Sequence, residues 1–491
     1  MTRQAAALAL ELRVQWRYRI PAVALVVTVV WTVVLLALPA PAARVAGPMI
    51  LTLDTATFGA FFIAALVLFE RGEGALAALA VSPLRLGEYL TVKVATLTGL
   101  ALLSAVPVAL AAGRADTGLG VLLPAVGLLA VLFLVLNVAI VAGQRSITGF
   151  LTVAPLPLIP LLAVPLAHLA GLVDHPLGYL VPTTGAADLI RLGIDPATVI
   201  SPLRATALAG YLLLATVIAT VAARRRLARA LTSPRPARPP RSRRGRAGSH
   251  PAGWLRALIH IDLRTTVRSA LLVIVLAGPI LLALALRLGY PPLTTYLHSR
   301  FGLDLVPYQP VLLAALVVLH VPLIIGMVGA LLILDDLDDR KVLILRASPV
   351  TLPRYLTYRI TAVAAVALVM LAIAVPVSGL APWPTLPAQA PALLLAAAQA
   401  PLLTLATVTL AGNKVEGLAW LKILALLPTA IAPALWWLAD PAAWPLRAVP
   451  YYWTVTALWH PTWLGLLTGA VLTAVAIAVL ARRTLRRLAS G

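Results

Sequence analysis

The chain has 491 residues, of which 61% are hydrophobic and only 11% are charged, and its mean hydropathy is +0.98. Because soluble domains carry about 25% charged residues, this composition excludes a soluble globular protein and indicates one that is embedded in lipid. The sequence contains no cysteine, which excludes disulfide bonds and thiolate metal sites.

Apolar runs recur along the chain, and each is long enough to cross about 30 Å of hydrocarbon as a helix. The first run follows a basic stretch and is expected to remain as an uncleaved anchor helix. The sequence therefore predicts an all-α polytopic membrane protein with about twelve transmembrane helices. Six spans are predicted near residues 21–38, 51–69, 93–112, 119–142, 149–170 and 206–222. Six more are predicted near residues 269–287, 311–334, 360–380, 391–411, 418–438 and 463–480.

The basic residues are distributed unevenly between the two sides that these spans define. Most of the 39 Lys and Arg residues fall on the side that holds the N-terminus. The few on the other side are Arg44, Arg114, Arg191, Arg204, Arg287, Arg300 and Arg447. Since Lys and Arg accumulate in cytoplasmic loops, we expect both termini to be cytoplasmic in a multi-pass protein of the cell membrane.

Residues 226–250 are rich in Pro and Arg, and such a composition cannot bury a core. We predict a basic cytoplasmic linker here, which either contacts anionic lipid headgroups or serves only as a solvated tether. The net charge of +22 does not indicate a nucleic-acid partner. No aromatic side chains and no folded nucleic-acid-binding domain accompany the Arg-rich stretch. The linker separates two transmembrane halves, residues 1–225 and 251–491.

The two halves share short sequences in the same order. "SPLRLGEYLT" (82–91) matches "SPVTLPRYLT" (348–357), and "VAGQRS" (141–146) parallels "LAGNKV" (410–415). The kept order predicts an internal duplication of six spans. Because both halves start on the cytoplasmic side, they would be parallel six-helix repeats.

A polar segment connects spans two and three in each half, and it holds the candidate site residues. Each segment starts with carboxylates, continues with a Ser-Pro pair suited to a helix start, and enters span three beside a tyrosine. One interpretation is an interfacial elbow that only orients span three. The other is an elbow that a cytoplasmic subunit binds, so that its movement levers the two spans. The candidate docking residues are Glu70, Arg71, Glu73, Ser82, Pro83, Tyr89, Asp335, Asp336, Asp338, Asp339, Arg340, Ser348, Pro349 and Tyr355. If they bind a partner, the carboxylates would pair with its Arg or Lys side chains.

Two stretches of the first half have counterparts in a known family. They are "LRVQWRYRI" before span one and "FGAFFIAALVLFERGEGALAALAVSPLRLGEYLTVKV" across span two and the elbow. On these residues, and on the region around Pro182, the chain resembles the ABC-2 type permeases, in particular the fluoroquinolone-export permease group of bacterial ABC transporters. The resemblance implies six-span units that work in pairs with an ATPase, here fused into one chain. The second half departs at its elbow, with an Asp cluster where the first half has "ERGEG", so the two docking sites would differ.

The sequence holds no G-x-x-x-x-G-K-[ST] phosphate-binding loop, so we expect a transport subunit and not an enzyme. No cofactor is expected in this chain. The resemblance implies that ATP and Mg would bind a separate cytoplasmic ABC ATPase subunit, present in two copies. A pocket lined by aliphatic and aromatic groups suits a hydrophobic or amphiphilic small-molecule substrate. The predicted function is therefore the permease subunit of a bacterial ABC exporter.

Two other classes stay open. An ion-coupled secondary transporter can have the same six-plus-six layout, as in the major-facilitator proteins, but it needs ionisable residues inside the membrane. Asp54 and Lys422 are expected near span ends, where they can reach water. A membrane-embedded enzyme is disfavoured because the histidines lack metal-ligand spacing. Asp188, Arg191 and Asp195 are interpreted as the solvated face of a short extracellular helix.

Overall fold

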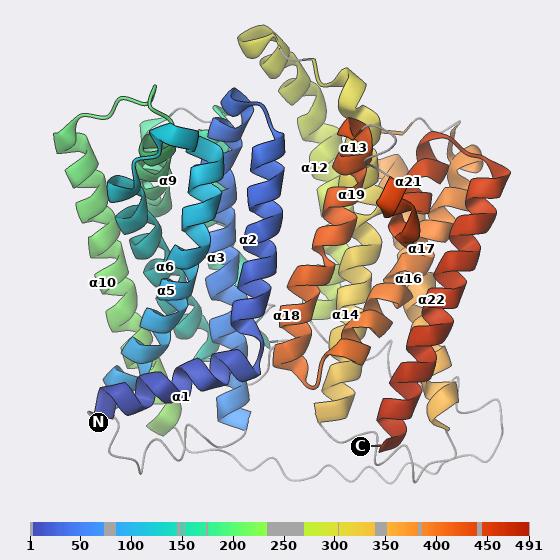
Figure 1. The fold of residues 1–491 in the computed structure, drawn as a ribbon, viewed down its shortest axis with the longest axis horizontal. Helices are drawn as coiled ribbons and strands as arrows, with labels where there is room; N and C mark the ends of the chain where they lie inside the picture. The colour runs from blue at the N-terminus through green and yellow to red at the C-terminus, as the bar shows by residue number, and fades with distance from the viewer. Residues whose placement is uncertain are drawn as a thin grey trace. The chain divides into compact units, whose positions relative to one another are not determined.

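A computed structural model describes residues 3–72, 85–144, 149–150, 153–172, 175–232, 270–302, 304–338, 351–381, 385–438 and 444–490. Among these residues the regular structure is helical, with no strand. The chain divides into two compact units, residues 1–242 and 243–491, and each is a bundle of long helices (Figure 1).

Eleven helices of the described chain are long and apolar enough to cross a membrane, and Pro155–Leu169 is a shorter apolar helix. These helices follow the order of the twelve predicted spans, so the prediction of an all-α polytopic membrane protein is confirmed. Several helices are longer than predicted. The second begins at Ala40, well before the predicted residue 51.

The described part of the first unit begins with a helix that the apolar runs do not predict. Helix α1 (Arg3–Arg17) runs across the ends of the other helices in Figure 1. Arg19 adopts the left-handed conformation with φ 57°, which turns the chain out of α1, and Pro21 then favours the start of the next helix. The remaining helices are α2 (Ile20–Ala37), α3 (Ala40–Gly72), α5 (Leu86–Gly113), α6 (Leu119–Val141), α8 (Pro155–Leu169), α9 (Pro182–Ile194) and α10 (Pro202–Thr232), with the 3-10 turns η1 (Arg114–Asp116) and η2 (Pro176–Leu180).

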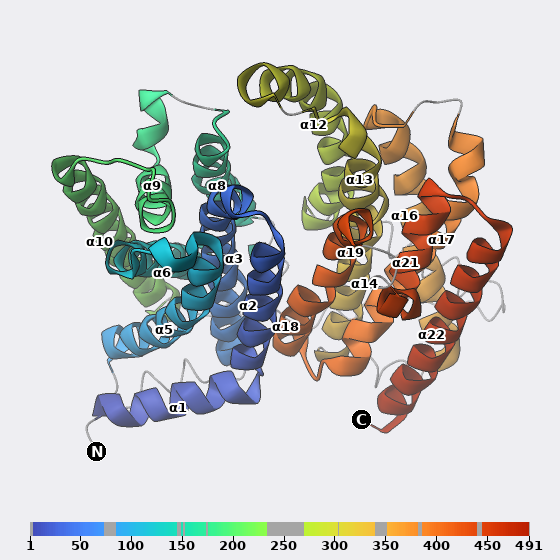
Figure 2. The same ribbon diagram turned by 45° about the horizontal axis from the view of Figure 1, so that its top comes forward.

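Helix α9 packs inside the first unit, between α3, α6, α8 and α10 (Figure 2). Ten of its residues are buried, from Thr183 to Ile194. Small residues allow this close approach, since a Cβ atom on Gly193 would lie 2.7 Å from the Cβ atom of Leu122 on α6. The short helix after span five therefore belongs to the core of the bundle.

The second unit is built around α17, whose buried residues pack against α14, α16, α21 and α22. Its helices are α12 (Ala270–Phe301), α13 (Gln309–Leu313), α14 (His320–Asp338), α16 (Leu352–Val377), α17 (Leu386–Leu410), α18 (Lys414–Leu424), α19 (Leu426–Trp437), α21 (Pro450–Trp459) and α22 (Trp463–Ser490). A π-helical turn (Ala314–Val318) joins α13 to α14, and the 3-10 turns η3 (Val306–Tyr308) and η6 (Trp444–Ala448) precede α13 and α21.

The predicted linker begins later than residue 226. Helix α10 continues to Thr232, and its last turns carry Arg residues, which the partial negative charge at a helix C-terminus favours. The rest of the predicted linker lies outside the described residues.

Candidate functional site

The ends of α3 and α5 that are predicted to face the cytoplasm are joined by charged side chains. Glu70 lies in the last turn of α3, and Tyr89 and Lys93 lie one turn apart on α5. The Lys93 Nζ atom lies 2.8 Å from Glu70 Oε1, and the Tyr89 hydroxyl donates a hydrogen bond to Glu70 Oε2. The Lys93 side chain is fully buried. Spans two and three are therefore tied together on either side of the predicted elbow.

Helix α1 completes this cluster. Both Glu11 carboxylate oxygens lie 2.9 Å from Lys93 Nζ. Gln15, one turn further along α1, donates a 2.7 Å hydrogen bond to the Thr96 hydroxyl on α5. We call Glu11, Glu70, Tyr89 and Lys93 the inner cluster.

Burial makes the inner cluster sensitive to the loss of any member. Taking a charge out of water costs several kcal/mol, and Lys93 offsets this cost with two carboxylates. Charge-assisted hydrogen bonds of this length are about twice as strong as neutral ones. The cluster therefore fixes α1, α3 and α5 against each other.

The second unit repeats the arrangement with different residues. Asp336 near the end of α14 accepts a 2.6 Å hydrogen bond from the Tyr355 hydroxyl on α16. It also accepts a 2.9 Å bond from Arg359 Nη2. The Arg359 Nε atom donates to the Tyr355 hydroxyl at 3.3 Å. We call Asp336, Tyr355 and Arg359 the second cluster.

The two clusters correspond residue by residue. In each unit the tyrosine follows the carboxylate by 19 positions, and the base follows it by 23 positions. In each unit the base also lies 5.3 Å from the centre of the tyrosine ring, a distance at which a cation and a ring attract each other. The same three chemical roles therefore recur at the same spacing.

Two other candidate residues also contact groups within their own unit. Arg71 donates to the carbonyl oxygens of Ala142 at 3.3 Å and Gln144 at 2.7 Å, beyond the end of α6, and to that of Ala230 on α10. Asp335 forms an ion pair with Lys414 at the start of α18. These contacts connect span two to spans four to six.

The structure gives internal partners to the candidate residues that it describes. We expected Glu70, Asp335 and Asp336 to meet Arg or Lys of a partner, and each carboxylate is held by a base of its own unit. The side chain of Asp338 lies outside the described residues, as do Glu73, Ser82, Pro83, Asp339, Arg340, Ser348 and Pro349. Whether a partner binds these segments stays a prediction.

A second polar group lies at the opposite end of the first unit. His168 Nε2 on α8 lies 3.0 Å from Asp188 Oδ1 on α9. The Tyr179 hydroxyl donates a 2.6 Å hydrogen bond to Asp188 Oδ2 and accepts one of 2.6 Å from Arg204 on α10. These four residues, the outer network, connect α8, η2, α9 and α10.

The outer network changes the interpretation of Asp188, which is buried and not part of a solvated face. Arg191 is exposed and Asp195 is half-buried. Burial acts to raise the pKa of Asp188, but hydrogen bonds from His168 and Tyr179 and the charge of Arg204 outweigh it, so this pKa lies below its ordinary value. Burial and the hydrogen bond to Asp188 raise the pKa of Tyr179 to about 12.

Sequence reasoning missed Glu11 and the outer network. The amphipathic pattern of residues 3–17 is the signal for a surface helix that carries Glu11. It was missed because this stretch has no long apolar run. The signal for the network was a histidine close to an outer tyrosine and aspartate, but their separation in sequence does not predict contact. Among the described residues no group of three or more His, Cys, Asp or Glu side chains could hold a metal ion.

Each half of the chain matches a family of permeases. A family model described as "Fluoroquinolones export permease protein family" matches residues 2–233. A model described as "Fluoroquinolones export permease protein Rv2686c-like" matches residues 262–481. The resemblance expected from the sequence is thus confirmed in both halves.

Two relatives from Mycobacterium tuberculosis (strain ATCC 25618 / H37Rv) are similar to this chain. Fluoroquinolones export permease protein Rv2686c is 31% identical over 227 residues, which are 45% of this chain and 90% of the relative. Fluoroquinolones export permease protein Rv2687c is 34% identical over 195 residues, which are 40% of this chain and 82% of the relative. Each relative is thus about half as long as this chain. The chain therefore belongs to the fluoroquinolones export permease family, and it is a multi-pass membrane permease of the exporter type.

Proposed function

We propose that the chain is the permease of an ABC-2 type exporter in the cell membrane, with two duplicated six-helix halves in one polypeptide. A separate cytoplasmic ABC ATPase, in two copies, binds ATP with Mg and drives transport. The cargo is a hydrophobic or amphiphilic small molecule. The relatives' names support the export of drug-like compounds, and their half-length supports a fusion of two such units.

The correspondence between the inner and second clusters carries this proposal. Each cluster joins the helix ends at a predicted elbow, residues 70–93 in the first half and 335–359 in the second. Because spans two and three are fixed to each other there, a force on the elbow moves both helices together. A motor dimer needs one such connection in each half.

The internal ion pairs change which residues we expect to bind the ATPase. Glu70 and Asp336 hold helices together, so they transmit movement and do not bind the partner. The partner contacts would come from charged elbow residues that are free to differ between the halves, Glu73 in the first and Asp339 and Arg340 in the second. Surface ion pairs of this kind add about 0–1 kcal/mol each, so they set the register of docking more than its strength.

Co-purification tests the proposal. The tagged full chain is expressed with a cytoplasmic ABC ATPase from the same organism, and the complex is isolated in mild detergent. We expect the ATPase to co-purify with the wild-type chain, and Glu73→Lys combined with Asp339→Lys to reduce its recovery. Asp195→Lys, which makes a similar charge change on the opposite side, is the matched control. An ATPase that is recovered equally with all variants would contradict docking at the elbows.

An ion-coupled secondary transporter is the second candidate, because Asp54 lies inside a span. Transport into proteoliposomes separates the two. The ATP-driven exporter moves substrate only with the ATPase subunit and nucleotide present. Substrate movement that follows a pH gradient without nucleotide would establish the second candidate instead.

A further inference from the structure

Helix α1 runs across the ends of the membrane-spanning helices of the first unit (Figure 1). Its Glu11 side chain binds Lys93 of α5, and span three is predicted to begin at residue 93. That residue marks the depth at which the hydrocarbon of the bilayer gives way to the headgroups. The axis of α1 therefore lies along the membrane surface, on the side that is predicted to be cytoplasmic.

One side of α1 is apolar and exposed. Leu8, Leu12 and Trp16 follow one another at intervals of four residues, so they share one side of the helix. Their side chains are 42%, 51% and 75% exposed. At 3.6 residues per turn, Leu12 lies about 100° around the helix from Glu11, which is buried against the bundle. The apolar side therefore points sideways from the bundle, and at this depth lipid is the medium beside it.

Another side of α1 is basic. Arg13 and Arg17 are again four residues apart, both are exposed, and Arg13 lies about 200° around the helix from Glu11. Glu11 is the only carboxylate in residues 3–17, and Lys93 pairs with it on the bundle side. The exposed surface of α1 therefore carries positive charge with no negative charge of its own.

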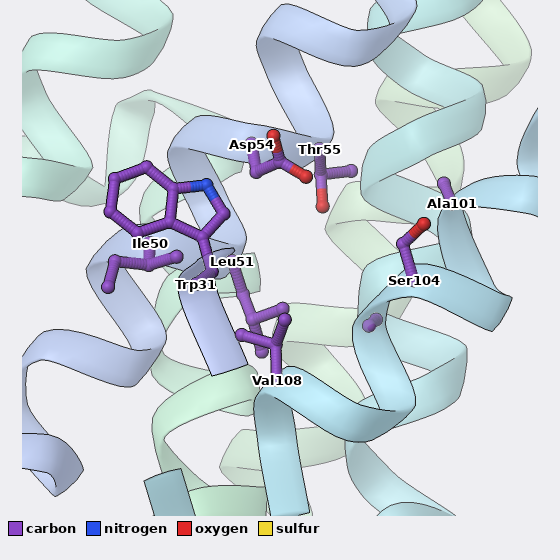
Figure 3. A pocket seen from close by; sticks show the side chains of 9 residues that line it. Trp31, Ile50, Leu51, Asp54, Thr55, Ala101, Ser104 and Val108 are labelled. Atoms are coloured by element: carbon purple, nitrogen blue, oxygen red, sulfur yellow. The ribbon is translucent and has the colours of Figure 1, made fainter. Parts of the chain in front are cut away.

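The spans that α1 crosses already pack on one another. Figure 3 shows Trp31 of α2, Leu51 of α3 and Val108 of α5 around a small pocket. Asp54, which we expected near a span end, lines the same pocket, because α3 begins at Ala40. Since these helices close on one another, the exposed sides of α1 are not needed to complete the packing of the spans.

An anionic phospholipid matches both exposed sides of α1. Its phosphate accepts paired hydrogen bonds from an arginine guanidinium, and its net negative charge attracts basic residues near the membrane surface. Its acyl chains cover Leu8 and Leu12, and the Trp16 indole is suited to the boundary between headgroups and hydrocarbon. A water-soluble anion would leave the apolar side in water. A zwitterionic lipid would bring no net negative charge to the two Arg residues.

We propose that α1 is an interfacial helix that binds anionic phospholipids of the cytoplasmic leaflet. Arg13 and Arg17 bind the headgroups, and Leu8, Leu12 and Trp16 lie among the first carbons of the acyl chains. Because Glu11 ties α1 to Lys93, bound lipid also holds the junction between α1 and α5 in place. This inference does not depend on the proposed export function.

Quenching of Trp16 by brominated lipids tests the proposal. The full chain is placed in nanodiscs that contain phosphatidylglycerol and phosphatidylcholine, with bromine on the acyl chains of one lipid or the other. Comparison with the Trp16→Phe form of the same protein isolates the fluorescence of Trp16. We expect brominated phosphatidylglycerol to quench Trp16 more strongly than brominated phosphatidylcholine. Arg13→Gln and Arg17→Gln should each lower this preference about fivefold, which corresponds to about 1 kcal/mol for each basic residue.

Two further variants separate charge at α1 from general effects. Arg13→Lys combined with Arg17→Lys keeps both charges and should keep most of the preference. Arg191→Gln removes an exposed Arg of α9 at the opposite end of the unit, and it is the matched control that should leave the preference unchanged. Thermal unfolding of each variant shows that the chain remains folded.

Three results would overturn the proposal. The first is quenching of Trp16 by the water-soluble quencher acrylamide and not by either brominated lipid, which would mean that α1 is solvated. The second is equal quenching by the two lipids. The third is loss of the lipid quenching when a cytoplasmic ABC ATPase is added, which would assign the exposed sides of α1 to that protein. The first two measurements contain no ATPase, so their failure leaves the exporter proposal standing.

Discussion

Glu70 and Asp336 hold the same place in the two halves of the chain. Each ends a second span, and each binds a tyrosine 19 positions later and a base 23 positions later. Lys93 also binds Glu11 of α1. The repeat therefore keeps the connection between spans two and three in both halves.

Lys93→Met should destabilise the first unit. Removing Lys93 leaves Glu11 and Glu70 without their base, and breaking a buried ion pair costs about 3 kcal/mol or more. Thermal unfolding of the full chain in detergent measures the effect.

Lys93→Arg is the control, because it keeps the charge and the donors, as Arg359 does in the second cluster. It should unfold close to the wild-type temperature. An unfolding temperature of Lys93→Met equal to that of the wild type would show that the ion pairs of Lys93 do not stabilise the first unit.

Tyr89→Phe and Tyr355→Phe should reduce ATP-driven transport while the ATPase still binds. Each change removes one hydrogen bond to a carboxylate, worth about 2 kcal/mol, and loosens the joint between spans two and three without changing Glu73, Asp339 or Arg340. Substrate uptake into proteoliposomes and co-purification of the ATPase separate the two readouts.

Tyr211→Phe is the matched control, since it removes a hydroxyl that donates to the Leu180 carbonyl near the outer end of the first unit. It should leave transport unchanged. Loss of ATPase binding in Tyr89→Phe or Tyr355→Phe would place docking, and not coupling, at the clusters.

Hydropathy was enough to predict the twelve apolar helices, because each must cover the same thickness of hydrocarbon. The repeated Ser-Pro and tyrosine pattern predicted an elbow in each half, and the Ser-Pro pairs lie outside the described residues. Local pattern could not show which charges meet, because Glu11 and Lys93 are 82 positions apart. Their contact depends on the turn at Arg19, which brings α1 across the ends of the spans.

The buried position of α9 was equally beyond sequence reasoning. Its small and polar residues resemble those of a solvated helix, yet they serve close packing and a hydrogen-bond network. In a membrane protein, contacts between helices are rich in small residues. The apolar pattern that marks the core of a soluble protein therefore does not identify them. Asp188 was therefore assigned to solvent, although His168 and Tyr179 enclose it.

Asp188→Asn should weaken the first unit at neutral pH and have less effect in acid. The pKa of Asp188 is lowered in the folded protein, so its stabilising contribution is present above the ordinary aspartate pKa of about 3.9. That contribution is lost as the pH falls through the lower folded value. The difference in unfolding temperature between wild type and variant, followed from pH 7 into acid, measures this.

The matched control for the acid series is Asp116→Asn. Asp116 pairs with Arg44 at an exposed site, where an ion pair contributes about 0–1 kcal/mol. It should give a small difference at every pH. The difference in unfolding temperature between the wild type and Asp188→Asn could instead stay constant as the pH is lowered. That result would mean that the charge of the carboxylate does not contribute to stability.

Gly326→Ala should destabilise the second unit. A Cβ atom on Gly326 of α14 would lie 2.6 Å from the backbone oxygen of Ala400 on α17, and backbone cannot move aside as a flexible side chain can. Forcing two packed helices apart costs about 1–3 kcal/mol. Gly278→Ala in α12 is the matched control, because no atom lies within 4 Å of its Cβ position and alanine favours a helix by about 1 kcal/mol. Thermal unfolding should therefore show a lower midpoint for Gly326→Ala and an equal or higher one for Gly278→Ala. Equal midpoints for the two variants would mean that α14 and α17 are not held together by close backbone contact at the centre of the second bundle.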